Sequence, residues 1–294
     1  MRVIIIGGSS IIGKEVYTTF ANRGVSTIAT YCNNYLNNMI KFDINSQALS
    51  EVIKDLNNDD KIIILSSITD VNWIFKNQKK SYEFNTYKII KLINDIAAIG
   101  CEIIYMSSAE VFDGRVGNYD ENCEPNPVNY YGKTKADVEK YLVSNIKNYK
   151  IVRTGWNVTD NIVSRCPINQ TMEALLKDNC KMATDNWFTI THAKDLADGM
   201  YALALANTKD TVFHLCSNEK ISRVMLADLV IKFSNQKNKM SYKKVKFSDI
   251  NYLEPRARLN DLSSLYTNKL LKLRYRTIEQ LVRKKIAIIE KKII

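Results

Sequence analysis

The sequence has few of the residues from which metal centres and disulfide frameworks are built. Its 294 residues include only two histidines, and its six cysteines are scattered, with no Cys-x-x-Cys pair and no Cys/His cluster. This spacing argues against a zinc site and against a disulfide-stapled fold, so we expect no metal. His192 and His214 lie near no metal-binding or nucleophile pattern, and ordinary packed or polar roles are expected for both. Neither a metal centre nor a disulfide framework is therefore expected to explain what this protein does.

The sequence also lacks a long apolar run and a convincing targeting signal. No uninterrupted hydrophobic stretch reaches the ~18 residues that a membrane-spanning helix needs. The opening MRVIIIGGSSIIG superficially resembles a signal peptide, but Gly7, Gly8, Ser9 and Ser10 interrupt it and no convincing cleavage site follows. We therefore expect a cytoplasmic protein that does not bind a membrane.

The net charge of +11 makes nucleic acid a partner to consider. However, the lysines and arginines are spread along the chain, and no helix-turn-helix, finger or aromatic RNA-binding signature accompanies them. We expect no nucleic-acid partner. A basic protein also suits an anionic small substrate, so charge alone does not decide the function.

What the sequence does contain begins at its N-terminus with a strand, a glycine-rich turn and a helix. Arg2 to Ile6 is an apolar, β-branched run typical of a strand buried on both faces, and GGSSIIG follows at once. Small residues let the backbone approach a pyrophosphate, and the helix N-terminus faces its charge. The turn matches G-x-x-G-x-x-G, with a serine in the middle place. It predicts a dinucleotide cradle formed by Gly7, Ser9, Ser10, Ile11, Ile12 and Gly13.

The following strands bear on which dinucleotide is bound. Val25 to Tyr31 ends in TYCNN, without the acidic residue that binds a ribose 2′-hydroxyl, so NADP(H) is slightly favoured over NAD(H). A brief strand, Met39 to Phe42, ends at Asp43, which could bond the adenine amino group or cap a helix starting near Ser46. Small hydroxyl residues after the strand at 62–65 face the crevice of a parallel sheet. These positions add Asp43, Ser66 and Ser67 to the expected cofactor contacts.

The order of the patterns indicates the fold class. Strands and helices alternate as far as Thr154, which predicts an α/β fold with a Rossmann-type, doubly wound parallel sheet. The alternation then becomes irregular, as expected for a smaller mixed α/β lobe that binds substrate. We expect a dinucleotide-binding domain over residues 1–155, with returns around 190–215. A substrate-binding lobe is expected mainly over residues 156–294, interleaved with the first domain.

One stretch indicates the chemistry. An apolar strand pattern delivers Ser107 and Ser108 to its C-terminal end, and a helical pattern later begins with Tyr131 and Lys135 four residues apart. Side chains at i and i+4 share a helix face. Tyr130 has no lysine at i+4 and is expected to pack or to contact substrate. The predicted catalytic residues are Ser108, Tyr131 and Lys135, a proton-transfer set that needs neither metal nor thiol.

These residues resemble the extended short-chain dehydrogenase/reductases, also known as the NAD-dependent epimerase/dehydratase superfamily, and most nearly the dTDP-4-dehydrorhamnose reductase branch. The likeness runs along nearly the whole chain, through GGSSIIG, YMSSAEVFDG, YYGKTK, IVRTGW, FTITHAKDLA and EPRARLNDLSSL. By matching position, the resemblance adds Ile44 and Asn85 to the cofactor contacts. It also implies the catalytic roles. Ser108 should hold the substrate oxygen, and Lys135 should bond the nicotinamide ribose.

In the same resemblance, Tyr131 should contact the cofactor and protonate the alkoxide as hydride reaches the keto carbon. A free tyrosine has a pKa of about 10 and donates poorly at neutral pH. We expect the Lys135 ammonium to favour the phenolate and so to lower the pKa of Tyr131.

The chain departs from the reductase pattern beside Ser108. That branch has an acidic and an aromatic residue where this chain has Ala109 and Glu110. Sugar-nucleotide 4,6-dehydratases use an Asp-Glu pair there, but Ala109 cannot donate a proton, so dehydration is disfavoured. Trp156 either stacks on substrate or belongs to the core. Cations at 153, 165, 181 and 256 are candidates for gripping a diphosphate. The expected substrate contacts are Thr69, Ala109, Glu110, Trp156 and Arg256.

The resemblance implies an NAD(P)H-dependent reductase of a nucleotide-linked 4-keto-6-deoxy sugar, with a place in deoxysugar and polysaccharide biosynthesis. Its partner would be a nucleotide sugar, and a homodimer is compatible with the pattern. Two alternatives stay open. One is a sugar-nucleotide epimerase that keeps NAD tightly bound, and the other is a non-catalytic, NADP-binding regulatory subunit. The intact Tyr-Lys pair argues against the regulatory reading.

Overall fold

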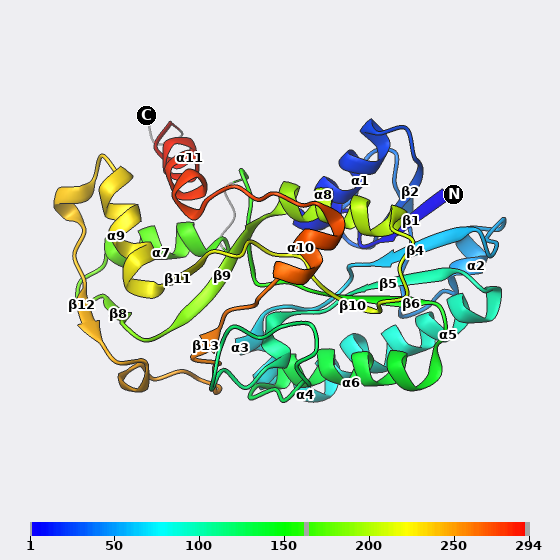
Figure 1. Ribbon diagram of the computed structural model, residues 1–294, viewed down its shortest axis with the longest axis horizontal. Coiled ribbons are helices and arrows are strands. Elements are labelled where there is room, and N and C mark those ends of the chain that lie inside the picture. Colours follow the sequence, from blue (N-terminus) through cyan, green and yellow to red (C-terminus); the bar gives the residue numbers. More distant parts are fainter. Residues whose placement is uncertain (1, 162–164, 292–294) are drawn as a thin grey trace.

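A seven-stranded parallel sheet forms the centre of the larger lobe in this computed structural model, which describes residues 2–161 and 165–291 (Figure 1). The strand order is β10-β6-β5-β4-β1-β2-β3, so the chain works outward from β1 in both directions. The expected doubly wound α/β fold is therefore confirmed. The strands are β1 (Arg2–Ile6), β2 (Ser26–Tyr31), β3 (Ile40–Lys41), β4 (Asp60–Ile64), β5 (Glu102–Met106), β6 (Tyr149–Arg153) and β10 (Val212–His214).

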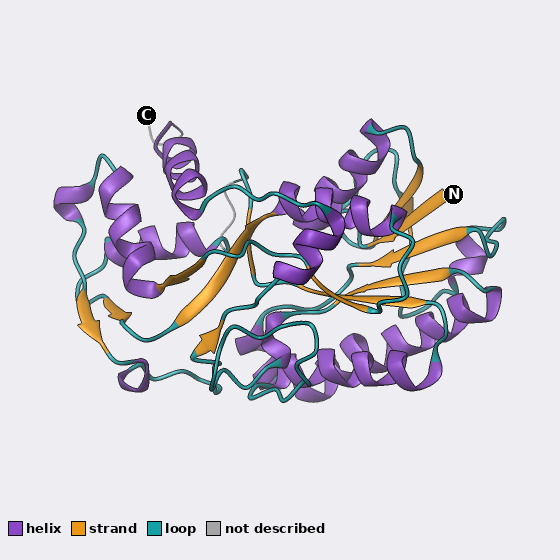
Figure 2. Cartoon of the chain, in the orientation of Figure 1, coloured by secondary structure: helices purple, strands orange, loops and turns teal. Residues whose placement is uncertain are grey.

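Helices cover both faces of this sheet, as Figure 1 and Figure 2 show. On one face lie α1 (Ile11–Asn22) and α8 (Ala193–Leu205), and on the other α5 (Ile89–Ile99) and α6 (Tyr130–Asn145). Successive strand residues point to opposite faces. In β4, Ile62 and Ile64 enter one core while Ile63 enters the other. Burial on both sides explains why these strands read as unbroken apolar runs.

The sequence pattern over residues 82–98 is typical of one long helix, but the structure divides this region into three parts. Helix α4 (Gln78–Tyr82) is followed by a π-helical turn (Glu83–Lys88) and then by α5, which ends at Gly100 with a φ of +93°. A π turn inserts one extra residue per turn and is frequent at functional sites. Here it buries Asn85 and points its amide at the loop after β4. Periodicity alone did not reveal this interruption.

The second lobe is built around β9 (Trp187–His192). That strand joins β7 (Trp156–Val158), β11 (Lys220–Ser222) and β13 (Leu259–Asn260) in one sheet. The flanking helices share its core and are α7 (Pro167–Leu175), α9 (Arg223–Phe233) and α11 (Ile278–Lys291). We propose the domain division expected above, with residues 1–155 as one unit and 156–294 mainly as the other. The returns expected around 190–215 correspond to α8 and β10, which belong to the first sheet and its core. The remaining elements are β8 (Lys181–Ala183), which pairs with β12 (Lys243–Val245), and the short α2 (Leu49–Val52), α3 (Val71–Lys76) and α10 (Leu265–Leu271).

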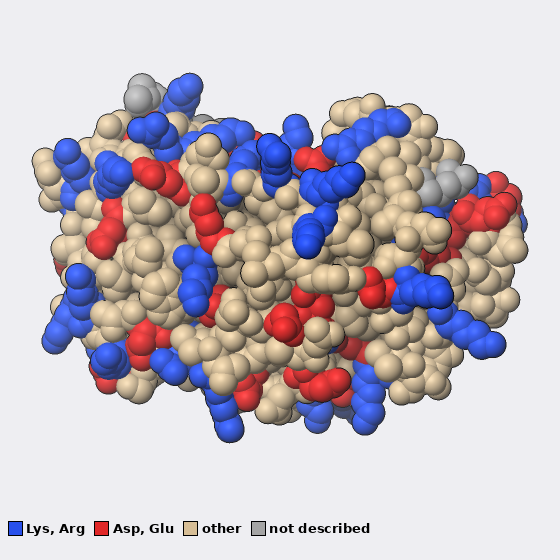
Figure 3. All heavy atoms as spheres, in the orientation of Figure 1, with Lys and Arg blue, Asp and Glu red and all other residues tan. Residues whose placement is uncertain are grey.

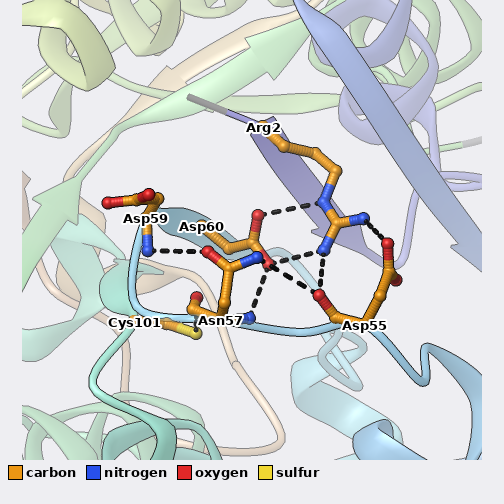
Figure 4. A network of polar contacts seen from close by, with 6 residues as sticks. All are labelled: Arg2, Asp55, Asn57, Asp59, Asp60 and Cys101. Atoms are coloured by element: carbon orange, nitrogen blue, oxygen red, sulfur yellow. Dashed lines mark hydrogen bonds and ion pairs between the residues drawn. The ribbon is translucent and has the colours of Figure 1, made fainter.

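An ion-pair network ties β1 to β4 at the amino ends of the strands, opposite the edge where the site lies (Figure 4). The Arg2 guanidinium donates to Asp60 at 2.9 and 2.7 Å and to Asp55 at 2.6 Å. Burial raises the pKa of Asp60, but hydrogen bonds from Arg2 and from the Asn57 backbone outweigh it and hold that pKa below its usual value. The network therefore fixes the register of the two central strands.

The surface in Figure 3 shows basic and acidic side chains interspersed over the visible face. In the part of the chain that the structure describes, no helix is long and apolar enough to cross a membrane. The same part contains no group of three or more His, Cys, Asp or Glu side chains placed to hold a metal ion.

Candidate active site

The glycine-rich turn after β1 forms a backbone cradle with no room for side chains. Gly7 has a φ of +85°, and a Cβ placed on Gly13 would stand 2.3 Å from the Gly7 carbonyl oxygen. Ser10 caps α1 by accepting a hydrogen bond from Gly13 N at 3.0 Å. The N-terminus of α1 thus opens onto a turn of glycines and serines, and Ile11 is 40% exposed at its start. This cradle fits the diphosphate of a dinucleotide, because free N–H groups and the helix dipole favour an anion.

The loop after β4 is held open beside the cradle by Asn85. Its Oδ1 accepts from Ile68 N at 2.8 Å and from the Ser67 hydroxyl at 3.2 Å, and its Nδ2 donates to Ile68 O at 2.9 Å. The Asn85 amide is therefore engaged in positioning the loop. A Cβ placed on Gly7 would meet the Ser66 hydroxyl at 2.7 Å, so Ser66 borders the glycine turn directly.

Asp43 lies at the end of β3 and closes a local turn. Its Oδ1 accepts from the backbone and side-chain nitrogens of Asn45, both at 2.9 Å. The helix expected near Ser46 begins later, as α2 at Leu49, so Asp43 does not cap it. The Asp43 carboxylate also lies near Cys32, at the end of β2. Burial and this carboxylate raise the pKa of the Cys32 thiol. Ile44 packs against the core below.

The predicted catalytic serine and tyrosine meet where β5 ends and α6 begins. Ser108 accepts from Glu110 N at 3.2 Å and starts a 3₁₀ turn (Ala109–Val111). Asn129 caps α6 by accepting from Gly132 N at 2.8 Å. The two segments touch at Gly132, where an added Cβ would stand only 1.9 Å from the Glu110 carbonyl oxygen. This close packing places Tyr131, a residue that is 8% exposed, with Ser108 in the lining of one cavity.

The electrostatics of Tyr131 differ from the expectation. Burial and the Glu110 carboxylate raise the pKa of Tyr131, and hydrogen bonding to Ser108 and Ser67 only partly opposes them. The expected lowering by Lys135 is wrong for this structure. The Lys135 Nζ donates to Met106 O at 3.0 Å and lies 6.0 Å from the centre of the Tyr131 ring. Burial lowers the pKa of Lys135 to about 7, so the amine is only partly charged at neutral pH.

A cavity of about 740 Å³ opens beside these residues, between the two lobes. Four of the five expected substrate residues line it, but Ala109 does not. Ala109 is 1% exposed and packs with Val111 and Phe112. A larger groove of about 1090 Å³ runs along the outer side of α6 and includes neither Ser108 nor Tyr131. The residues that line the smaller cavity include Thr69, Ser108, Glu110, Tyr131, Trp156, Arg165, Arg223, Arg256 and Asn260.

Trp156 proves to be both core and cavity wall. Its ring stacks on Phe188 with centroids 4.6 Å apart, and the Arg223 guanidinium lies 4.0 Å above it. Burial lowers the pKa of Arg223 to about 10. Arg223 was missed from the sequence because its position depends on the pairing of β11 with β9, which no local pattern shows.

The four cations considered for a diphosphate have different surroundings. Arg153 is 3% exposed and forms an ion pair with Glu139 at 2.8 Å, so it is structural. Arg165 and Arg256 both line the cavity. Arg165 donates to Thr69 at 3.0 Å, and Arg256 donates to Asn72 at 2.9 Å. Lys181 lies on β8, outside the cavity.

With this geometry in place, comparison with known proteins identifies the family. Residues 1–289 match the family model described as the RmlD substrate binding domain. The chain belongs to this family. Membership confirms the extended short-chain dehydrogenase/reductase assignment and its reductase-like branch. It also confirms the expectation of an NAD(P)-dependent oxidoreductase of that type.

Similar proteins include a reductase and a subunit of a methionine adenosyltransferase. The chain is 26% identical over 238 residues to methionine adenosyltransferase 2 subunit beta of Mus musculus, covering 77% of this chain and 70% of the relative. It is 24% identical over 227 residues to dTDP-4-dehydrorhamnose reductase of Mycobacterium tuberculosis, covering 76% and 72%. Among solved structures, dTDP-4-dehydrorhamnose reductase from Bacillus anthracis in complex with NADP has the same fold. It superposes with a TM-score of 0.78 at 19% identity, covering 97% and 98% of the two chains.

Proposed function

We propose that this protein is an NAD(P)H-dependent reductase of a nucleotide-linked 4-keto-6-deoxy sugar, with Tyr131 as the proton donor. The observation that carries the proposal is that Tyr131 and Ser108 lie together in the wall of the 740 Å³ cavity. Both groups can donate a hydrogen bond to one carbonyl oxygen and polarise it. The similarity to dTDP-4-dehydrorhamnose reductase supports the choice of substrate.

The raised pKa of Tyr131 suits the reductive direction. Burial keeps the phenol protonated at neutral pH, so it is present as the acid that an alkoxide needs. Ser108 holds the substrate oxygen in this scheme. Lys135, with a pKa of about 7, has its Nζ 6.0 Å from the centre of the Tyr131 ring and can exchange a proton near neutral pH.

The glycine cradle would hold the dinucleotide, with Gly7, Ser10 and Gly13 against the diphosphate and Ser66 and Ser67 beside the reactive end. When bound, the cofactor supplies the hydride. We propose NADP(H) in preference to NAD(H). No acidic residue stands at 32–34. The charge of Lys41 reaches Cys32 at the end of β2, where it partly opposes the rise in the pKa of that thiol. Calorimetric titration with NADPH and NADH tests this preference, and tighter binding of NADH would contradict it.

Three arginines support a diphosphate-bearing substrate. The cavity is lined by Arg165, Arg223 and Arg256. The charges of Arg256 and Arg223 lower the pKa of the Glu110 carboxyl there, against the effect of burial. Guanidinium groups match the geometry of phosphate oxygens and are well suited to bind them. The cavity thus combines a proton donor with a cationic wall, as a nucleotide sugar requires.

The reductase proposal is tested by following NADPH consumption with dTDP-, UDP- and GDP-linked 4-keto-6-deoxy sugars. We expect turnover with one of them, and a loss of ~10²-fold or more in kcat for Tyr131→Phe, because the variant cannot donate the proton. Tyr130→Phe is the matched control and should keep most of the activity. Consumption of none of the three sugars by a folded protein that binds NADPH would refute the proposal.

The similarity to methionine adenosyltransferase 2 subunit beta favours a second candidate, a regulatory subunit that binds the dinucleotide without turnover. The same Tyr131→Phe experiment separates the two readings, because a regulatory subunit has no turnover for the substitution to abolish. An epimerase on this scaffold would retain NAD through purification, so protein that purifies without a dinucleotide argues against it.

A further inference from the structure

Glu110 is held in the cavity by two amides that come from distant parts of the chain. The Asn129 Nδ2 donates to Glu110 Oε2 at 2.5 Å, and the Asn260 Nδ2 donates to Oε1 at 2.9 Å. The orientation of Asn129 is fixed, because its own Oδ1 caps α6 through Gly132 N. The carboxylate therefore occupies one position, beside the helix turn that carries Tyr131.

This arrangement leaves acceptors without donors. A carboxylate accepts about four hydrogen bonds, and those of Glu110 within the described part of the chain number two. The Oδ1 of Asn260 has no partner there either, although Asn260 is only 4% exposed. The buried Asn260 Oδ1 without a partner is unfavourable, and Glu110 is partly exposed to the cavity, so a ligand that brings O–H groups to this corner would be stabilised.

The charges around Glu110 come from both lobes. Burial raises the pKa of Glu110, whereas Asn129, Arg256, Asn260 and Arg223 lower it. Ser108 and Tyr131, the donors on this wall, are directed at the reacting oxygen in the proposed reaction. Glu110 and Asn260 line the same cavity as these donors, so their acceptors are available to a neighbouring substituent of the sugar ring.

We propose that Glu110, together with Asn260, is a specificity-determining residue that accepts hydrogen bonds from a hydroxyl on the carbon beside the one that is reduced. The inference rests on the proposed reductase function and adds to it the requirement for a free hydroxyl at that neighbouring carbon. A sugar with hydrogen or a methyl ether there would leave the acceptors unpaired. Sites built to pair a substrate hydroxyl discriminate strongly against analogues that lack it.

The test measures binding without turnover, by calorimetry with dTDP-, UDP- and GDP-linked 6-deoxyhexoses and, for the nucleotide that binds most tightly, with the counterpart lacking the hydroxyl at C3. We expect wild-type protein to bind the hydroxylated sugar at least about tenfold more tightly, and Glu110→Gln to bind the two within about threefold. The substitution keeps the shape of the side chain, and Asn260 can turn its Oδ1 toward the introduced amide. Asp137→Asn is the matched control, because it removes one negative charge from α6 outside the cavity and should retain the tenfold preference.

Each outcome decides the inference. Equal affinities of the wild-type protein for the two sugars, or an undiminished preference in Glu110→Gln, would overturn it and leave the reductase proposal intact. Failure of the wild-type protein to bind either sugar would count against the reductase proposal as well. If circular dichroism shows that Glu110→Gln does not fold, Asn260→Ser serves as the second variant, with the same expected loss of preference.

Discussion

The contact between Gly132 and the Glu110 carbonyl gives the most direct test of how the fold sets the active site. A Cβ at residue 132 would stand 1.9 Å from that oxygen and 2.9 Å from the Pro127 Cβ, whereas real Cβ atoms essentially never approach within 3.0 Å. Gly132→Ala must therefore move the Ala109–Val111 turn and α6 apart by about 1 Å, from 1.9 to at least 3.0 Å. Because Ser108 starts that turn and Tyr131 precedes Gly132, the shift separates the two hydroxyls.

We expect Gly132→Ala to lower kcat/KM by roughly 10²-fold, which is the typical cost of a 1 Å misplacement. The clash should destabilise the fold by about 1–3 kcal/mol, and the better helix propensity of alanine offsets about 1 kcal/mol of this. Activity and urea unfolding are measured together. Gly24→Ala is the control, since Gly24 has a φ of +73° and nothing within 4 Å. It should lose stability through backbone strain alone and keep its kcat/KM. An active Gly132→Ala variant would refute the reasoning.

Two further predictions concern stability and pH. Lys135 has a folded pKa of about 7, below its ordinary 10.5, so the unfolded chain binds a proton that the folded chain releases between these values. The unfolding free energy of the cofactor-free protein should therefore rise from pH 7 to pH 10, and Lys135→Met should flatten that rise in urea titrations at several pH values. The pKa of Asp60 is depressed, so its contribution is present above the ordinary value of 3.8 and is lost as pH falls below it. Asp60→Asn should lower the free energy of unfolding by about 2 kcal/mol at pH 7 and by less at pH 3, and it should leave kcat unchanged. An equal loss of unfolding free energy at both pH values would contradict the role given to Arg2.

The sequence predicted those parts of the site that depend on local patterns. The cradle could be predicted because strand, turn and helix are consecutive, and Tyr131 with Lys135 because they share one helix. Arg223 and Asn260 could not be predicted, because β11 and β13 place them beside the first lobe through pairing with β9. The environment of Lys135 was equally hidden. Spacing puts it near Tyr131, but only the fold shows that its amine points to Met106 O.

The partly charged state of Lys135 follows from how one carboxylate is shared. Glu139, one turn further along α6, is the group that raises the pKa of Lys135 against the effect of burial. However, the same carboxylate receives hydrogen bonds from Ser107 and, at 2.8 Å, from Arg153, both of which are buried. A carboxylate already neutralised by a guanidinium stabilises a second cation only weakly. Arg153 therefore bears on the charge of Lys135 through Glu139, without lining the cavity beside Tyr131. A fully paired Lys135 would stay charged throughout neutral pH, whereas this arrangement lets it exchange a proton there, 6.0 Å from the centre of the ring whose phenol is proposed to donate one.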